Sequence, residues 1–98
     1  MIRHVVLIQP NSQATDDALQ SLGEQIERLA GRMCGDGAYV IGPNTTEEPL
    51  AQGYLFGFTM DFPDRQALAT YHADPEHAEV ASSIKALAAS VLVFDFNV

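Results

Sequence analysis

The sequence predicts an α+β domain with the element order β-α-β-β-α-β, the ferredoxin-like arrangement, in which the second helix is split in two. Three observations predict this fold. Apolar residues alternate with a period of two in several short segments, they recur at helical spacing between those segments, and turn residues separate the segments. A chain of 98 residues suits one domain, so we expect a single four-stranded antiparallel sheet over residues 1–98.

The first element is a strand. Residues 2–9 are rich in β-branched and aliphatic side chains, and they stop at the turn pair Pro10-Asn11. Alternation along this segment predicts a face that meets the helices. The residues on that face are Ile2, His4, Val6 and Ile8.

A long helix follows. Thr15 can cap its start, Asp16 and Asp17 suit the positive end of its dipole, and Gly31 and Gly35 are expected to loosen its end. One face of this helix is apolar and faces the core. The apolar residues at helical spacing are Leu19, Leu22, Ile26, Leu29 and Met33.

Two strands and a loop occupy the middle of the chain. Residues 37–41 predict a short strand, and the polar residues 42–49 predict a surface loop that is a candidate mobile lid. Residues 53–62 predict a third strand with an aromatic face. That face carries Tyr54, Phe56, Phe58, Met60 and Phe62.

The last third of the chain predicts two helices and a final strand. Pro63-Asp64 begins a short helix, Asp74-Pro75 ends it and caps the next one, and residues 91–98 form the strand. The inner face of the short helix carries Leu68 and Tyr71. The stripe of the second helix comprises His77, Val80, Ala81, Ile84, Leu87 and Ala88.

Helices cover only one face of this sheet, so the other face needs a second sheet, and an identical chain is the simplest source. Hydrophobic residues make up 47% of the chain. In so small a domain, burial at ~25 cal/mol per Å² barely exceeds the cost of ordering the chain. We therefore predict a homodimer that meets through the sheet face, forming a dimeric α+β barrel.

The charge balance excludes two classes of partner. Thirteen acidic residues against five basic ones give a net charge of −8, and no basic stripe is present. Such a surface repels nucleic acid and anionic membranes. No apolar run is longer than four residues, the length of residues 91–94, which is far too short for a membrane span, so we expect a cytoplasmic protein. Cys34 is the only cysteine, which excludes an intrachain disulfide; a small turn residue is favoured over a reactive thiol.

Tyr71 and His77 are the strongest candidates for acid-base chemistry. Asp74 and Pro75 place His77 in the first helical turn, facing the sheet, where the positive helix end should lower its pKa. A neutral imidazole can accept a proton, as a general base must. The Tyr71 hydroxyl could reach the same cavity and donate to a developing oxyanion.

Structural interpretations of the histidines stay open. His77 could simply bond the backbone or a carboxylate, and His4, on a buried strand, could be a hydrogen-bonded core residue rather than a pocket residue. His72 is adjacent to Tyr71 and is expected to point toward solvent. The scatter of the three histidines predicts no metal site, and no nucleotide-binding or serine-hydrolase motif occurs, so we expect no cofactor.

Several segments together resemble the stress-responsive A/B barrel domain (Dabb) family, over nearly the whole chain. They are Ile2–Leu7, Gly53-Tyr54, Asp61–Leu68 with Tyr71, Asp74–His77 and Val91–Phe96. The resemblance implies a ferredoxin-like fold and a dimeric α+β barrel. The family includes a plant polyketide cyclase that closes its substrate by intramolecular aldol condensation.

By that resemblance, the base would be His77, assisted by Tyr71 and His4. The chain departs from the family at Asp74, where a histidine is usual, and at Phe56, which replaces a further histidine of the cyclase.

Two classes of function follow from these residues. The first is an enzyme that binds a small, partly apolar carbonyl compound between helices and sheet; the second is a non-catalytic stress-response or ligand-sequestering protein with structural histidines. A cavity of ~300 Å³ or more beside His4, Tyr71 and His77 would favour the first. The expected ligand-contacting walls are Val6, Phe56, Phe58, Leu68, Val80, Ile84 and Phe94.

Overall fold

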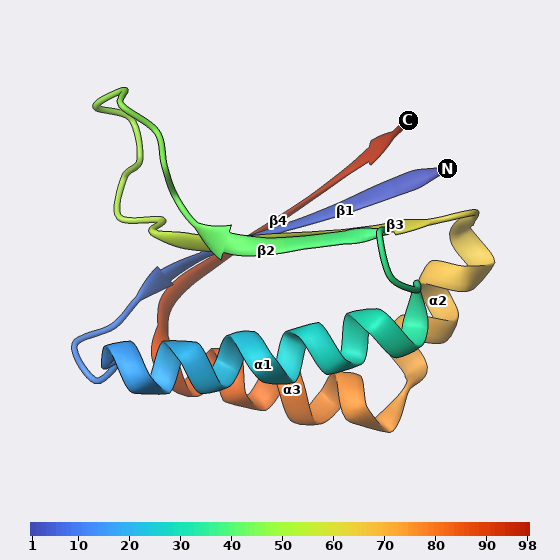
Figure 1. Ribbon diagram of the computed structural model, residues 1–98, viewed down its shortest axis with the longest axis horizontal. Coiled ribbons are helices and arrows are strands. Elements are labelled where there is room, and N and C mark those ends of the chain that lie inside the picture. Colours follow the sequence, from blue (N-terminus) through green and yellow to red (C-terminus); the bar gives the residue numbers. More distant parts are fainter.

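A four-stranded antiparallel sheet carries all three helices on one face (Figure 1). The computed structural model describes residues 1–98. The strands lie in the order β2-β3-β1-β4, which confirms the predicted ferredoxin-like α+β fold. The elements are β1 (Ile2–Pro10), α1 (Asp16–Met33), β2 (Tyr39–Pro43), β3 (Phe56–Phe62), α2 (Arg65–Ala73), α3 (Pro75–Leu87) and β4 (Ala88–Asn97).

β1 lies in the interior of the sheet and pairs with both β3 and β4. Val6 stands between Phe58 and Val93, and its neighbour on the same face, His4, stands opposite Asp95. The alternation predicted for β1 is confirmed, because its helix-facing side chains are buried and those between them are more exposed. The pairing of the first and last strands thus places His4 beside Asp95 on the helix-facing side.

α1 begins where its cap predicts. The Thr15 hydroxyl accepts a hydrogen bond from the Ala18 amide at 3.1 Å, and the helix starts at Asp16. Its apolar stripe buries Leu22, Ile26 and Leu29 against the sheet. The helix continues through Gly31 and ends at Met33, and Gly35, with a φ of +87°, follows its end.

Two strands start later than predicted, and glycine conformations explain why. Gly37 has a φ of +84°, outside the strand region, so β2 begins at Tyr39. Gln52 and Gly53, with φ of 53° and 82°, form a turn that delays β3 until Phe56. At the other end of the chain, α3 passes directly into β4, so Ala88 belongs to the strand and not to the helical stripe.

Two aspartates define the junction between α2 and α3. The Asp64 carboxylate accepts from the Ala67 amide at 2.8 Å, and that of Asp74 accepts from the Glu76 amide at 2.9 Å. Pro75 occupies the first position of α3, where its missing N–H costs no helical bond. Both caps are as predicted, and they fix the direction in which α3 leaves the junction.

The buried core lies between the helices and the inner face of β1 and β3. All 13 residues of this apolar cluster lie on β1, β3 and the helices, and none lies on β4. The inner face of β4 is therefore only loosely covered by α3. The cluster comprises Ile2, Val6, Ile8, Leu22, Ile26, Leu29, Ala30, Phe58, Met60, Phe62, Leu68, Tyr71 and Val80.

The outer sheet face carries no helix and is strongly apolar. Leu92, Phe94 and Phe96 of β4 are 40%, 53% and 49% exposed on it. The loop of residues 44–55 rises on this outer side, away from the helices (Figure 1). The predicted surface loop therefore lies beside the hollow on the outer face, and none of its residues lines the cavity between helices and sheet. None of the three helices is long and apolar enough to cross a bilayer.

Candidate active site

A cavity of about 700 Å³ lies between the inner sheet face and helices α2 and α3. It exceeds the ~300 Å³ expected of a ligand pocket. Most of its polar lining gathers at one end, where α2, α3, β1 and β4 meet, its middle is apolar, and Lys85 and Ser90 line it toward the other end. The polar residues of the end where these four elements meet are His4, Tyr71, His72, His77 and Asp95.

The structure brings the three predicted acid-base residues together. His4, Tyr71 and His77 all line this cavity, from β1, α2 and α3. Four of the predicted wall residues do so as well: Val6, Phe58, Val80 and Ile84. The cavity therefore draws its walls from both sheet and helices.

Three predicted wall residues do not line it. Phe94 is on the outer sheet face, because Val93 and Asp95 face inward and side chains alternate along a strand. Leu68 is sealed in the core at 6% exposure. Phe56 points toward α1, where its ring lies 3.7 Å from the position that a Cβ at Gly23 would occupy. The prediction that these three residues line the cavity is therefore wrong.

Four rings pack together at the polar end. The Tyr71 and His77 ring centroids are 4.7 Å apart, those of His4 and Tyr71 are 5.8 Å apart, and all these contacts are edge-on or tilted. His72 completes the group, with centroids 5.5 Å from His4 and 5.3 Å from His77. We call these residues the histidine cluster.

His72 is the unexpected member of the histidine cluster. It is exposed, as predicted, but its ring lines the cavity and contacts His4 and His77 instead of pointing away. Helical periodicity could not place it, because the chain changes direction between His72 and His77 at Asp74-Pro75. The sequence feature that could have indicated this contact is the placement of His72 and His77 on either side of the helix break at Pro75.

Asp95 orients His4. The Nδ1–H of His4 donates to Asp95 Oδ1 at 2.7 Å, which leaves Nε2 as the nitrogen free of a protein partner. His4 is 4% exposed and lines the cavity, so a ligand can reach its Nε2 only from the cavity. Sequence reasoning missed Asp95, although pairing the first and last strands would have placed it beside His4.

Burial shifts the pKa values of the titratable residues at the polar end of the cavity. The pKa of His77 lies below its ordinary value of 6.5 because the ring is partly buried and because His72 and His4 add like charge. The predicted direction is confirmed, but the cause is burial and neighbouring histidines. The pKa of His72 is lowered for similar reasons, and burial raises the pKa of Tyr71 to about 12. His77 is thus neutral at pH 7, while Tyr71 keeps its proton.

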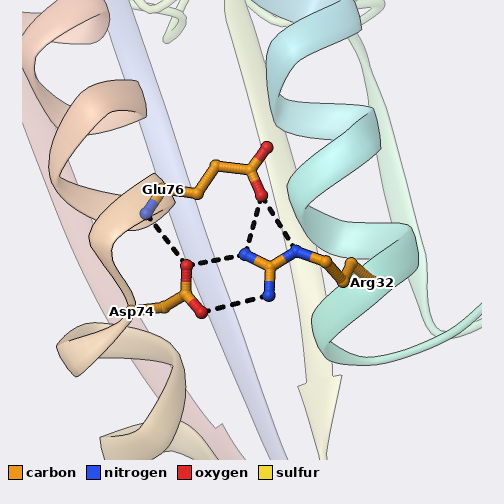
Figure 2. A network of polar contacts seen from close by, with 3 residues as sticks. All are labelled: Arg32, Asp74 and Glu76. Atoms are coloured by element: carbon orange, nitrogen blue, oxygen red, sulfur yellow. Dashed lines mark hydrogen bonds and ion pairs between the residues drawn. The ribbon is translucent and has the colours of Figure 1, made fainter.

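Arg32, in the last turn of α1, clamps the α2–α3 junction (Figure 2). Its Nη2 donates to Asp74 Oδ1 at 2.6 Å, and its Nε donates to Glu76 Oε1 at 3.0 Å. The guanidinium holds the pKa of Asp74 below its usual range. The negative charge of Asp74 raises the pKa of the neighbouring His77. The positive charge of Arg32 offsets that of Asp74 and so favours the uncharged imidazole of His77. Arg32 therefore positions the turn that carries His77 and screens its nearest carboxylate.

Metal ligation is not indicated by the side-chain arrangement. No group of three or more His, Cys, Asp or Glu side chains is placed to hold a metal ion. Cys34 is a free, partly buried thiol at the end of α1, and burial raises its pKa. Its Sγ donates to the carbonyl of Ala30 at 3.1 Å, consistent with the predicted structural role.

The fold and this cavity define an α+β barrel-type ferredoxin-like protein. The chain matches the Stress responsive A/B Barrel Domain over residues 2–98 and belongs to the Dabb family. Among curated proteins, it is 27% identical over 96 residues to the stress-response A/B barrel domain-containing protein HS1 of Arabidopsis thaliana. That alignment covers 98% of this chain and 88% of HS1.

Solved structures give the same fold. A dimeric ferredoxin-like protein of unknown function from Jannaschia sp. CCS1 is 26% identical, with a TM-score of 0.86 over 99% of this chain and 98% of that one. A hydroxynitrile lyase from Passiflora edulis has a TM-score of 0.87 over 99% of this chain and 92% of its own. At 15% identity, that second likeness concerns the fold alone.

Proposed function

We propose that the protein binds a small, partly apolar carbonyl compound in the cavity and that His77 removes a proton from the carbon next to the carbonyl. The observation that supports this most directly is the meeting of His77, Tyr71 and His4 at one end of a ligand-sized cavity. The reaction class would be that of a polyketide cyclase, an intramolecular aldol condensation.

His77 suits the role of base. Its lowered pKa keeps the ring neutral at pH 7, and no side-chain hydrogen bond within the chain involves its nitrogens. The one buried side-chain polar atom without a partner belongs to Gln25, so the His77 nitrogens are not sealed in the core. A lone pair is therefore available to a ligand in the cavity.

Tyr71 and His4 suit the carbonyl oxygen. Tyr71 is 2% exposed, lines the cavity and keeps its proton because its pKa is raised to about 12. No hydrogen bond within the chain involves its hydroxyl, so the proton can be donated to a ligand. A hydroxyl donor held in place in this way stabilises the negative charge of an enolate. His4, held by Asp95, directs the lone pair of Nε2 to the same region, where it can accept a hydrogen bond from an enol hydroxyl of the ligand.

The proposed chemistry balances without a cofactor. A His77 ring nitrogen takes the proton, and the electron pair of the broken C–H bond moves into the carbonyl to give an enolate. The enolate carbon then attacks a second carbonyl of the same ligand. The new alkoxide recovers the proton from His77, which restores the neutral ring and completes the aldol addition. Loss of the new hydroxyl together with an α-hydrogen, as water, would then complete the condensation.

We also propose that the chain forms a homodimer through its outer sheet face. Its exposed apolar side chains, including Leu92, Phe94 and Phe96, make an area that a lone domain does not bury. The loop of residues 44–55 and this face enclose a hollow of about 600 Å³ that can receive partner side chains. The Jannaschia protein with this fold is described as dimeric.

A hydrogen-exchange experiment tests the proposed base. Wild-type protein and His77→Gln are incubated in D₂O with methyl ketones and with phenolic and polyketide-like acids, and proton NMR follows loss of the α-hydrogens. Wild type should catalyse exchange, and His77→Gln should lower the rate by about 100-fold or more. Thermal shifts identify which compounds bind.

Tyr71→Phe provides the matched control, because it keeps the ring and removes only the hydroxyl. It should slow exchange less than His77→Gln does. A folded His77→Gln protein that exchanges at the wild-type rate would contradict the proposal. Ligand binding without exchange in wild type would instead identify a non-catalytic, ligand-sequestering protein.

A further inference from the structure

The far end of the cavity carries Lys85, the only lysine of the chain. We propose that Lys85 binds the carboxylate of an elongated acid, whose carbonyl group lies at the histidine cluster. This inference rests on the proposed function, since it names the class of substrate for the same site: a keto acid with an apolar chain between its two polar groups.

Two elements give the same distance between the polar ends. Lys85 follows His77 by two helical turns on α3, which corresponds to about 12 Å at 1.5 Å per residue. On β4, Val91 lies four residues before Asp95, which corresponds to about 13 Å. All four of these residues line the cavity. The cavity is thus elongated, with a cation at one end and the bases at the other.

The electrostatic setting of Lys85 differs from that of the other basic residues. Arg3 and Arg32 are engaged with carboxylates, and Arg28 lies in a separate acidic hollow on α1. Arg65, at the start of α2, does not line the cavity. Lys85 makes no ion pair, and the cavity's only carboxylate, Asp95, is occupied by His4. In a chain of net charge −8, this leaves one unpaired cation beside an otherwise apolar channel.

The channel between the two ends selects against short, hydrophilic acids. Val80 and Ile84 line it from α3, and Val91 and Val93 line it from β4. An aliphatic or aromatic chain buried there gains ~25 cal/mol per Å². The exposure of Lys85 places its ammonium at the rim, where a carboxylate is bound without full desolvation of either charge.

The test uses straight-chain keto acids that carry a methyl ketone at one end and a carboxylate at the other, from hexanoate to decanoate length, with their methyl esters. Dissociation constants are measured by calorimetry for wild type, Lys85→Gln and the control Arg28→Gln. Lys85→Gln should weaken binding of the decanoate-length acid by about tenfold or more and leave its ester unchanged. Arg28→Gln should change neither.

The length of the keto acid distinguishes a site that binds both of its ends from a general electrostatic attraction of carboxylates to Lys85. The preference of wild type for acid over ester should grow from the short to the long members, since only the long ones reach both ends. An equal preference at every length, or acids and esters bound equally by wild type and Lys85→Gln, would overturn the inference.

Hydrogen exchange at the methyl ketone keeps the two proposals distinguishable. Exchange that depends on His77 but not on Lys85, for acid and ester alike, would refute the acid site and retain the base. Binding that depends on Lys85 with no exchange by wild type would support the acid site and refute the base.

Discussion

His4 and Asp95 stand opposite each other on the antiparallel strands β1 and β4, with His4 Nδ1 2.7 Å from Asp95 Oδ1. This pairing joins the two ends of the chain at the polar end of the cavity. Its consequence is a fixed tautomer, because an ionised Asp95 requires the proton of His4 to be on Nδ1. The geometry of the proposed oxygen-binding group is therefore set by the sheet register.

Asp95→Asn should disturb His4 without removing a ring from the site. The amide can donate to Nδ1 and so favour the opposite tautomer, which places the proton on Nε2. We expect the rate of α-hydrogen exchange to change by roughly tenfold and its pH profile to move. Kinetics across pH and the control Asp17→Asn, on the surface of α1, check this; identical profiles for wild type and Asp95→Asn would contradict it.

Arg32→Gln should reduce exchange by roughly tenfold through the position and the pKa of His77. The substitution removes the contacts to Asp74 and Glu76, so the junction loosens. An unscreened Asp74 also raises the pKa of His77, which moves the pH profile upward. Arg28→Gln is the matched control, and Arg32→Lys should recover part of the activity. A lower rate with an unmoved pH profile would reduce Arg32 to a structural role.

Periodicity in the sequence predicts most of the fold. The faces of β1 and β3 and the stripe of α1 follow from alternation and helical spacing, and the caps at Thr15, Asp64 and Asp74 mark the helix starts. These signals are local, so a sequence displays them directly. The strand starts at Tyr39 and Phe56 were missed because backbone turns, not composition, decide them.

The candidate site was predicted only in part because its assembly depends on long-range geometry. His4, Tyr71 and His77 stand out by residue type and local position. Asp95 depends on which strands pair, and His72 depends on the angle at the α2–α3 junction. Phe94 was assigned to the wrong sheet face because residues 91–94 are all apolar, so the sequence does not show which alternate positions face inward.

Stability should rise with pH across the interval just below 6.5. The pKa values of His72 and His77 are lower in the folded chain than the ordinary 6.5, so the unfolded chain binds more protons in that interval. The loss of folding stability caused by protonating these histidines is complete below their folded-state pKa values and disappears above 6.5. Denaturant unfolding at fixed protein concentration checks this. The double variant His72→Gln/His77→Gln should show a shallower slope, and an equal slope would contradict the pKa shifts.

Two glycine-to-alanine substitutions should act in opposite directions. Gly53 has a φ of +82°, which an alanine adopts at a cost of roughly 1–2 kcal/mol, so Gly53→Ala should destabilise the fold. Gly23 lies inside α1, and an added Cβ would make an ordinary contact 3.7 Å from the Phe56 ring. Gly23→Ala should therefore stabilise by about 0.5–1 kcal/mol. Thermal unfolding gives both signs, and a stabilising Gly53→Ala would be inconsistent with the turn at Gln52-Gly53.

Phe94→Asp should separate the proposed dimer into monomers. Phe94 is 53% exposed on the outer sheet face and packs beside Phe96 at a ring-centroid distance of 4.8 Å, so a charge there would be buried without a partner in a sheet-to-sheet contact. Light scattering after gel filtration measures the mass, and Glu79→Ala on the exposed face of α3 serves as the control. Because Phe94 lies on the opposite face from the histidine cluster, its replacement removes no cavity contact. A Phe94→Asp protein that stays dimeric would move the interface away from the outer sheet face.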